Sequence, residues 1–250
     1  MNLDFGVVFS SFDVMLRAFR ISIVVALAGF AIALVAGAGL ALCRRSRLRP
    51  VRLLAFAYVN FFRGAALYVL IIWLWLGLAV ATGIRIGTLS AGILTLALLN
   101  SAYLAEVFRA GIDAVDGGQK EAALAMGLAP GQAFRAVVAP QALRISLPAT
   151  GNHLVDAIKD SAILSVIGIP ELMRETARLA QFEQRPFEFY VVAAGMYLAA
   201  VYAASALFRF LERRLDLDRP AGRWSRGRPV RSTEPGGGRV QPVGTALGRG

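Results

Sequence analysis

Hydrophobic residues gather into long runs along this chain, and four of the runs contain no charged side chain. Each run contains about 20 residues, which is enough for an α-helix to cross a hydrocarbon core of roughly 30 Å. The pattern predicts membrane-spanning helices over residues 21–42, 64–84, 86–105 and 189–208. We therefore expect an all-α membrane protein.

A fifth run, over residues 147–169, is apolar at both ends but charged in its middle. It contains His153, Asp156, Lys159 and Asp160, so hydropathy alone supports it weakly as a span. We retain it because an odd number of spans explains how the basic residues are distributed. The prediction is about five transmembrane helices.

Basic residues are sorted among the connections between the predicted spans. The second connection contains only Arg85, whereas ten arginines follow Phe208. The first and third connections are also basic, with Arg44, Arg45, Arg47, Arg49 and Arg52 in the first and Arg109, Lys120, Arg135 and Arg144 in the third. Five spans place all three basic regions in the cytoplasm, which puts the N-terminus outside and the C-terminus inside. The net charge of +11 therefore reflects membrane orientation, and we expect no nucleic-acid partner.

The composition changes abruptly near residue 216. Residues 1–215 are expected to form one transmembrane domain, whereas residues 216–250 are rich in Arg, Gly and Pro. Such a segment cannot bury enough apolar surface to fold alone, so we predict a basic, disordered cytoplasmic tail. Its arginines can touch anionic membrane lipid, although a merely tolerated tail explains them more simply.

The third connection, about residues 109–146, is longer than a simple link between helices needs to be. Asp116 is a suitable N-cap, and Gly127 can adopt the left-handed conformation that ends a helix. These signals predict a two-turn helix over residues 119–126. Because isolated helices of this length are marginal in water, something outside the chain is expected to support it. An interfacial helix is the alternative, but this segment is mostly alanine and lacks large apolar anchors.

The connector also contains a recognisable motif. Glu121, Ala122, Ala123 and Gly127 form the pattern Glu-Ala-Ala-x-x-x-Gly, and Val-Val-Ala-Pro follows at residues 137–140. This resembles the cytoplasmic loop of the permease subunits of binding-protein-dependent ABC importers, specifically the polar amino acid subgroup. Residues 100–112, 144–148, 159–161 and 211–215 also look like this subgroup, in the same order. The resemblance covers most of the chain.

The resemblance implies a type I ABC importer transmembrane domain in the bacterial inner membrane. It would pair with a second copy or a homologous permease chain and receive an amino acid or similar small zwitterion from an extracytoplasmic solute-binding protein. The short helix would be the coupling helix that ATPase subunits hold, and the residues of the ATPase-coupling loop would be Glu121, Ala122, Ala123, Gly127 and Pro140. The chain lacks the pattern Gly-x-x-x-x-Gly-Lys-Ser/Thr, so ATP hydrolysis is expected in a separate subunit.

Charged residues at membrane depth cost about 2.5 to 3.5 kcal/mol each, so they are expected to face protein or a watery cavity. Asp156, Lys159 and Asp160 share one helix face. They either line the substrate path or form a structural ion pair, and an alternative function is a secondary transporter or channel that uses them. Asn60 is a fourth substrate-path candidate. The family commonly has Glu at that position and Thr-Pro at Ala65 and Ala66, which weakens the assignment of a particular solute.

No enzymatic centre is expected. His153 is the sole histidine, and we assign it to helix packing or an interface. The sole cysteine, Cys43, has no metal-binding pattern around it. The sequence therefore predicts no catalytic residue, no cofactor and no metal site.

Overall fold

The structure, a computed structural model, describes residues 4–214, and these residues form helices and short connections without a strand. The expected tail over residues 216–250 lies outside the described residues. The first half of the fold contains α1 (Gly6–Ser10), α2 (Phe12–Arg44), α3 (Arg49–Gly64), α4 (Leu67–Ile72), the π-helix η1 (Trp73–Gly77), α5 (Leu78–Thr82) and α6 (Thr88–Asp113). The second half contains α7 (Gly117–Ala125), α8 (Pro130–Ala133), the π-helix η2 (Phe134–Val138), α9 (Ala139–Asp160), the 3-10 helix η3 (Ser161–Ile167), α10 (Leu172–Phe182) and α11 (Pro186–Arg214).

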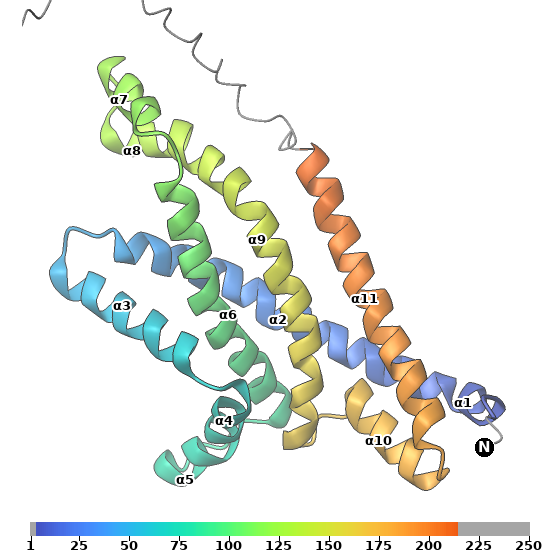
Figure 1. The fold of residues 1–250 in the computed structure, drawn as a ribbon. Coiled ribbons are helices and arrows are strands. Elements are labelled where there is room, and N and C mark those ends of the chain that lie inside the picture. Colours follow the sequence, from blue (N-terminus) through green and yellow to red (C-terminus); the bar gives the residue numbers. More distant parts are fainter. Residues whose placement is uncertain (1–3, 215–250) are drawn as a thin grey trace, which may run out of the picture. The chain divides into compact units, whose positions relative to one another are not determined.

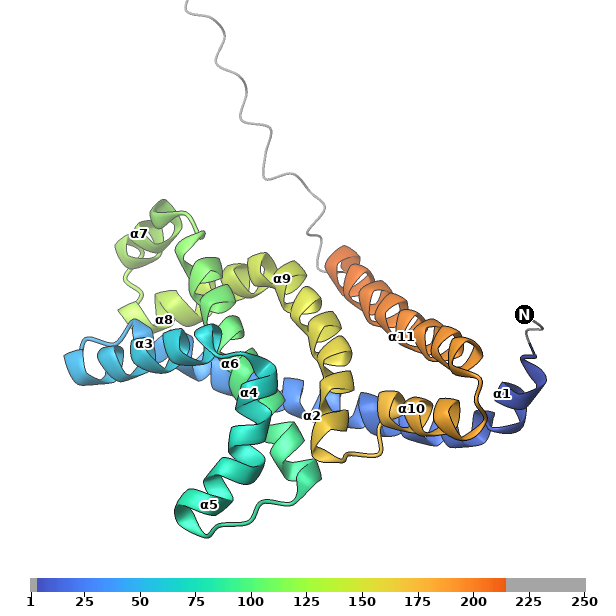
Figure 2. The same ribbon diagram turned by 60° about the horizontal axis from the view of Figure 1, so that its bottom comes forward.

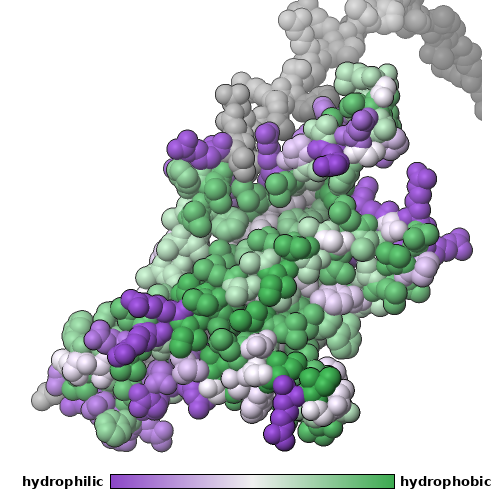
Figure 3. Space-filling view, turned by 180° about the vertical axis from the view of Figure 1, so that it is seen from behind, coloured by the Kyte–Doolittle hydropathy of each residue, from purple (hydrophilic) through white to green (hydrophobic). Residues whose placement is uncertain are grey.

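Among residues 4–214, three helices are long and apolar enough to cross a membrane. They are α2, α6 and α11, and they correspond to the predicted spans over residues 21–42, 86–105 and 189–208, although α6 begins two residues later than predicted. The helix α2 begins before its predicted span, so Arg17 and Arg20 are helical. Apolar side chains cover much of the middle of the face in Figure 3, and hydrophilic residues gather toward its margins. This distribution fits a protein whose middle lies in lipid.

The predicted span over residues 64–84 corresponds to the helical run Leu67–Thr82, which begins after a sharp bend. Helix α3 and the helical run Leu67–Thr82 are long and apolar enough to cross a membrane only when they are taken together, and the chain bends by 108° between them. Ala65 and Ala66 form the break, with extended backbone at ψ 134° and 127°. A sum of hydropathy contains no information about chain direction, so the sequence predicted a span over residues 64–84 but not the bend at its start.

The predicted span over residues 147–169 is also more complex than one helix. Helix α9 ends at Asp160, and the chain continues as η3 to Ile167 before Gly168 turns it at φ +91°. Its composition keeps α9 out of the group of candidate spans. It nevertheless packs against α2, α6 and α11 (Figures 1 and 2). The charged part of this run therefore lies in a helix that other helices surround.

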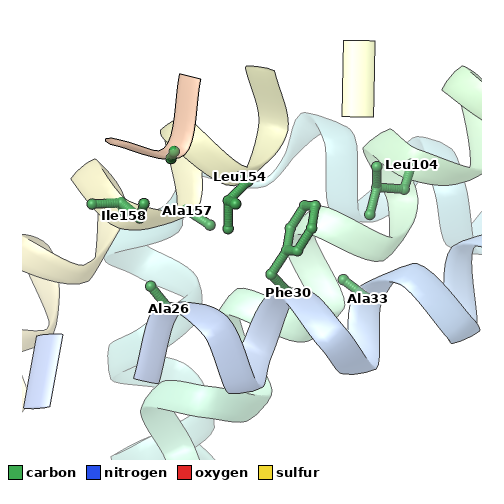
Figure 4. Packing of buried hydrophobic residues seen from close by; sticks show 8 residues of the cluster. Ala26, Phe30, Ala33, Leu104, Leu154, Ala157 and Ile158 are labelled. Atoms are coloured by element: carbon green, nitrogen blue, oxygen red, sulfur yellow. The ribbon is translucent and has the colours of Figure 1, made fainter. Parts of the chain in front are cut away.

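Small residues let α2 approach α6 and α9 closely. A Cβ on Gly29 would lie 2.8 Å from Leu96 Cβ, and one on Gly37 would lie 2.8 Å from Leu104 Cβ. Figure 4 shows part of the resulting core, where side chains of α2, α6 and α9 converge: Ala26, Phe30, Ala33, Leu104, Leu154, Ala157 and Ile158. Close approach of this kind replaces the hydrophobic driving force that lipid does not supply.

A buried carboxylate ties α10 to the rest of the fold, at the end of α6 and α9 opposite α7 (Figure 1). Glu171 is fully buried and accepts hydrogen bonds from the hydroxyls of Ser22 (3.2 Å) and Tyr197 (2.8 Å). The backbone N–H groups of Met173 and Arg174 also donate to it, at 2.9 and 2.7 Å. Burial raises the pKa of the Glu171 carboxyl, and these hydrogen bonds oppose that rise. Four donors thus hold α2, α10 and α11 together.

Candidate functional site

The connector contains a capped helix, as the sequence predicts. The Asp116 side chain accepts a hydrogen bond from the N–H of Gly118 at 2.8 Å, so it caps α7. At the other end Gly127 has φ +87°. The N–H of Gly127 donates to the Leu124 carbonyl at 3.0 Å, and the N–H of Leu128 donates to the Ala123 carbonyl at 3.2 Å. This pair of bonds is the glycine-ended helix termination known as the Schellman motif.

Helix α7 is mostly exposed. Ala123 is its only buried residue, at 1% exposure, whereas Glu121 and Ala122 are exposed and Met126 is 76% exposed. From the sequence, both Ala122 and Ala123 are expected to be available to a partner. The structure differs for Ala123, because successive helical residues point about 100° apart and α7 rests on α8 and η2 of its own chain. Ala122 and Glu121 lie on the open face.

Much of the predicted connector over residues 109–146 is helical. Helix α6 continues to Asp113, and from Pro130 the chain is helical through α8, η2 and α9. Only residues 114–129, with α7 in their middle, lie between these runs. Pro140 is therefore part of a helix, just after the π-helical turn η2. A proline has no N–H for the helical ladder, and a π-turn before it accommodates that missing bond.

Ion pairs fix the ends of the helices that carry the connector. Glu106 pairs with Arg44 of α2 and with Arg109 Nε at 2.9 Å. Asp113 pairs with Arg45 and with Arg109 Nη1 at 2.7 Å. Each pair is partly exposed, so each is worth about 1 kcal/mol or less. Together they join the end of α2 to the end of α6, next to the start of α7.

A second feature is a hollow of about 610 Å³ beside the break between α3 and α4. Its lining combines apolar and polar side chains: Ala65, Leu67, Leu99, Asn100, Tyr103, His153, Asp156, Lys159 and Asp160. Three of the four predicted substrate-path residues are therefore brought together. Asn60 is the exception, because it is exposed on α3 and donates to the Phe56 carbonyl of its own helix at 2.9 Å.

The charges in this hollow are partly paired. Lys159 Nζ lies 2.8 Å from Asp156 Oδ1, and both side chains are about half exposed. The other Asp156 oxygen lies 4.0 Å from His153 Nδ1. Asp160 forms no ion pair with any residue among 4–214. The structure thus contains both features that the sequence left as alternatives, namely an ion pair and a polar surface facing a cavity.

Two polar residues of α6 also line the hollow, and sequence reasoning did not select them. Asn100 is 2% exposed, and its amide donates to the Leu96 carbonyl at 2.9 Å. Tyr103 stacks on His153 with ring centroids 5.5 Å apart and an interplanar angle of 27°. The available signal was their spacing, because polar residues three apart in an apolar run share a helix face. His153, assigned above to packing, is part of the wall.

The lining of the hollow contains groups that can contact a small polar solute. No group of His, Cys, Asp and Glu able to hold a metal ion occurs within residues 4–214. The hollow offers two carboxylates, one ammonium, an amide and an aromatic pair, and these groups can bind the charged and polar ends of a small solute.

Comparison with known proteins gives consistent results. Residues 29–217 match the family described as binding-protein-dependent transport system inner membrane component. The arginine transport system permease protein ArtQ of Bacillus subtilis (strain 168) is 33% identical over 215 residues, which is 86% of this chain and 98% of the relative. The putative glutamine transport system permease protein GlnP of Rickettsia bellii (strain RML369-C) is 36% identical over 183 residues, or 73% and 84% of the two chains.

Solved structures are similar too. A crystal structure of an amino acid ABC transporter with histidines has a chain that is 34% identical, with a TM-score of 0.81 over 86% of this chain and 100% of that one. An inward-facing structure of the MetNI methionine ABC transporter has a TM-score of 0.67 at 22% identity, covering 82% and 98%. The second similarity concerns the fold alone.

Proposed function

We propose that this chain, which belongs to the family of binding-protein-dependent transport system inner membrane components, translocates an amino acid or similar small zwitterion. It is an inner-membrane permease that acts with ATPase subunits and a permease partner. The observation that carries the choice of solute is the hollow lined by Asp156, Lys159 and Asp160. Groups of both signs, placed side by side, match a solute that carries both an ammonium and a carboxylate.

In this proposal Asp160 is the main contact for the solute ammonium, because Lys159 already neutralises Asp156. Asn100 and Tyr103 add polar and aromatic surface from the facing helix. Several relatives support the solute class by their names, which refer to arginine, glutamine and cystine. The proposal therefore names an amino acid but leaves its side chain open.

The exposed face of α7 is proposed as the contact for a separate ATP-hydrolysing subunit. Glu121, Ala122 and Met126 are exposed, while Ala123 seats the helix on its own chain. Gly127 ends the helix, and Pro140 belongs to the helical run that supports it. A helix of this length gains most of its stability from packing, and a partner bound to its open face can supply that packing.

Transport in sealed vesicles tests the proposal. The complete complex, with its ATPase subunits and permease partner, is reconstituted, and uptake of radiolabelled arginine and glutamine is measured with the binding protein outside and ATP inside. We expect uptake only when both are present. A non-hydrolysable ATP analogue is the control. Uptake driven by an ion gradient without ATP would instead support a secondary transporter. Uptake of neither amino acid would reject arginine and glutamine as solutes.

A further inference from the structure

A strongly basic hollow lies where the ends of α2 and α6 meet the start of α3. Its volume is about 390 Å³, and it is lined by Arg44, Arg49, Arg52, Leu53, Phe56 and Arg109. Arg44 ends α2, Arg49 begins α3, and Arg109 lies in the last turns of α6. The fold therefore concentrates arginines from three helices around one space.

The carboxylates near this hollow do not balance its charge. Arg44 and Arg109 share Glu106, and Arg109 also uses Asp113. Arg49 and Arg52 form no ion pair with any residue of the described part of the chain. Like charges held close together repel one another, and an anion bound between them relieves this repulsion. The hollow thus has the electrostatics of an anion site.

Apolar side chains adjoin the arginines on the same helix. Leu53 and Phe56 line the hollow and are 67% and 50% exposed, and Leu54 beside them is exposed as well. The guanidinium of Arg44 lies 5.4 Å above the Phe56 ring. A free inorganic anion has no apolar part that could pack against these side chains. A phospholipid uses both parts, because its phosphate meets the arginines while its acyl chains lie along the apolar residues.

We propose that this basic hollow binds the phosphate of an anionic phospholipid from the cytoplasmic leaflet. Arg49 and Arg52 supply the free guanidinium groups, each of which can form two parallel hydrogen bonds to phosphate oxygens. The leaflet follows from the basic connections, which remain on the cytoplasmic side. The site is separate from the hollow that contains Asp160 and does not depend on the identity of the transported solute.

Native mass spectrometry of the purified complex, with its ATPase subunits in place, tests this site. The affinities for phosphatidylglycerol and for phosphatidylcholine are measured in the unmodified protein and in the double variant Arg49→Gln/Arg52→Gln. The matched control is Arg47→Gln/Arg144→Gln, which removes the same charge from exposed positions outside the hollow. Each arginine near an anionic surface changes affinity about fivefold, so we expect about a thirtyfold loss for the first double variant. The control is expected to lose about threefold or less.

Several results would overturn the proposal. Equal binding of the two lipids would indicate general lipid coating, and equal losses in both double variants would indicate a diffuse charge effect. Full competition by inorganic phosphate would assign the hollow to a soluble anion. Loss of the ATPase subunits in Arg49→Gln/Arg52→Gln would assign it to a protein contact. The variant Arg49→Lys/Arg52→Lys keeps the charge and is a second test in case the glutamine variant misfolds. It is expected to lose only part of the affinity. Unchanged affinity in a folded Arg49→Gln/Arg52→Gln variant would reject the site.

Discussion

The connector and the Asp160 hollow are built in opposite ways. Helix α7 and both of its caps come from one continuous stretch, residues 116–128, and its open face has no partner within the described chain. The hollow is assembled from the break between α3 and α4, from α6 and from α9, whose lining residues span positions 65–160. One region is formed by neighbouring residues and has an open face, whereas the other is lined by residues that lie far apart in the sequence.

This difference shows where each region is sensitive to change. A local element depends on backbone conformation at single positions, because few tertiary contacts support it. An assembled cavity depends on how closely its walls pack and on which polar groups face inward. Substitutions in the connector should therefore disturb coupling without destabilising the bundle, and substitutions in the hollow's walls should change solute affinity, helix packing or both.

The largest effect is expected at Gly127. Replacing Gly127 with Val places a β-branched residue at φ +87°, where side chains other than glycine are strained. We expect ATP-dependent uptake to fall more than about tenfold while the melting temperature of the permease in detergent changes little. The matched control is Gly131→Val, because Gly131 has no positive φ and no neighbour within reach of an added Cβ. Equal losses in the two variants would remove the special role of the α7 terminus.

A smaller effect is expected from Asp160→Asn. Removing this carboxylate, which forms no ion pair among residues 4–214, should raise the transport KM about tenfold, equivalent to about 1.4 kcal/mol. The maximal ATPase rate should stay the same. Initial uptake rates across a range of concentrations of binding protein loaded with labelled solute provide the measurement.

Asn60→Ser is the control for this comparison, since Asn60 lies outside the hollow. We expect its KM to match that of the unmodified protein. An unaltered transport KM and uptake rate in Asp160→Asn would reject a substrate-binding role for this carboxylate. A larger effect in Asn60→Ser than in Asp160→Asn would restore the original substrate-path assignment of Asn60.

The smallest effect is expected where α9 packs on α11. A Cβ on Gly151 would lie 2.6 Å from Phe208 Cγ, so Gly151→Ala overpacks this contact at a cost of about 1 to 3 kcal/mol. For a domain of this size we expect the melting temperature to fall by about 4 °C. Gly195→Ala is the control, because nothing lies near an added Cβ there. Phe208→Leu should partly rescue Gly151→Ala, and a fall of equal size in Gly195→Ala would show that the contact is unimportant.

The elements that the sequence predicted well depend on short-range physics. The long spans follow from the free energy of placing apolar residues in lipid, and α7 follows from the capping of its ends by Asp116 and Gly127. Sums along the chain and turn chemistry suffice for these features, because each involves only neighbouring residues.

By itself, the sequence determined that this protein is a helical membrane permease and which segment is its capped connector helix. Only the tertiary structure decided that Asn100, Tyr103 and His153 join Asp160 around one hollow and that Asn60 does not. It also decided that the chain bends by 108° after Gly64 and that Ala123 faces inward. The physical reason is distance along the chain: contacts between α6 and α9 depend on helix directions and packing angles, which local patterns do not contain.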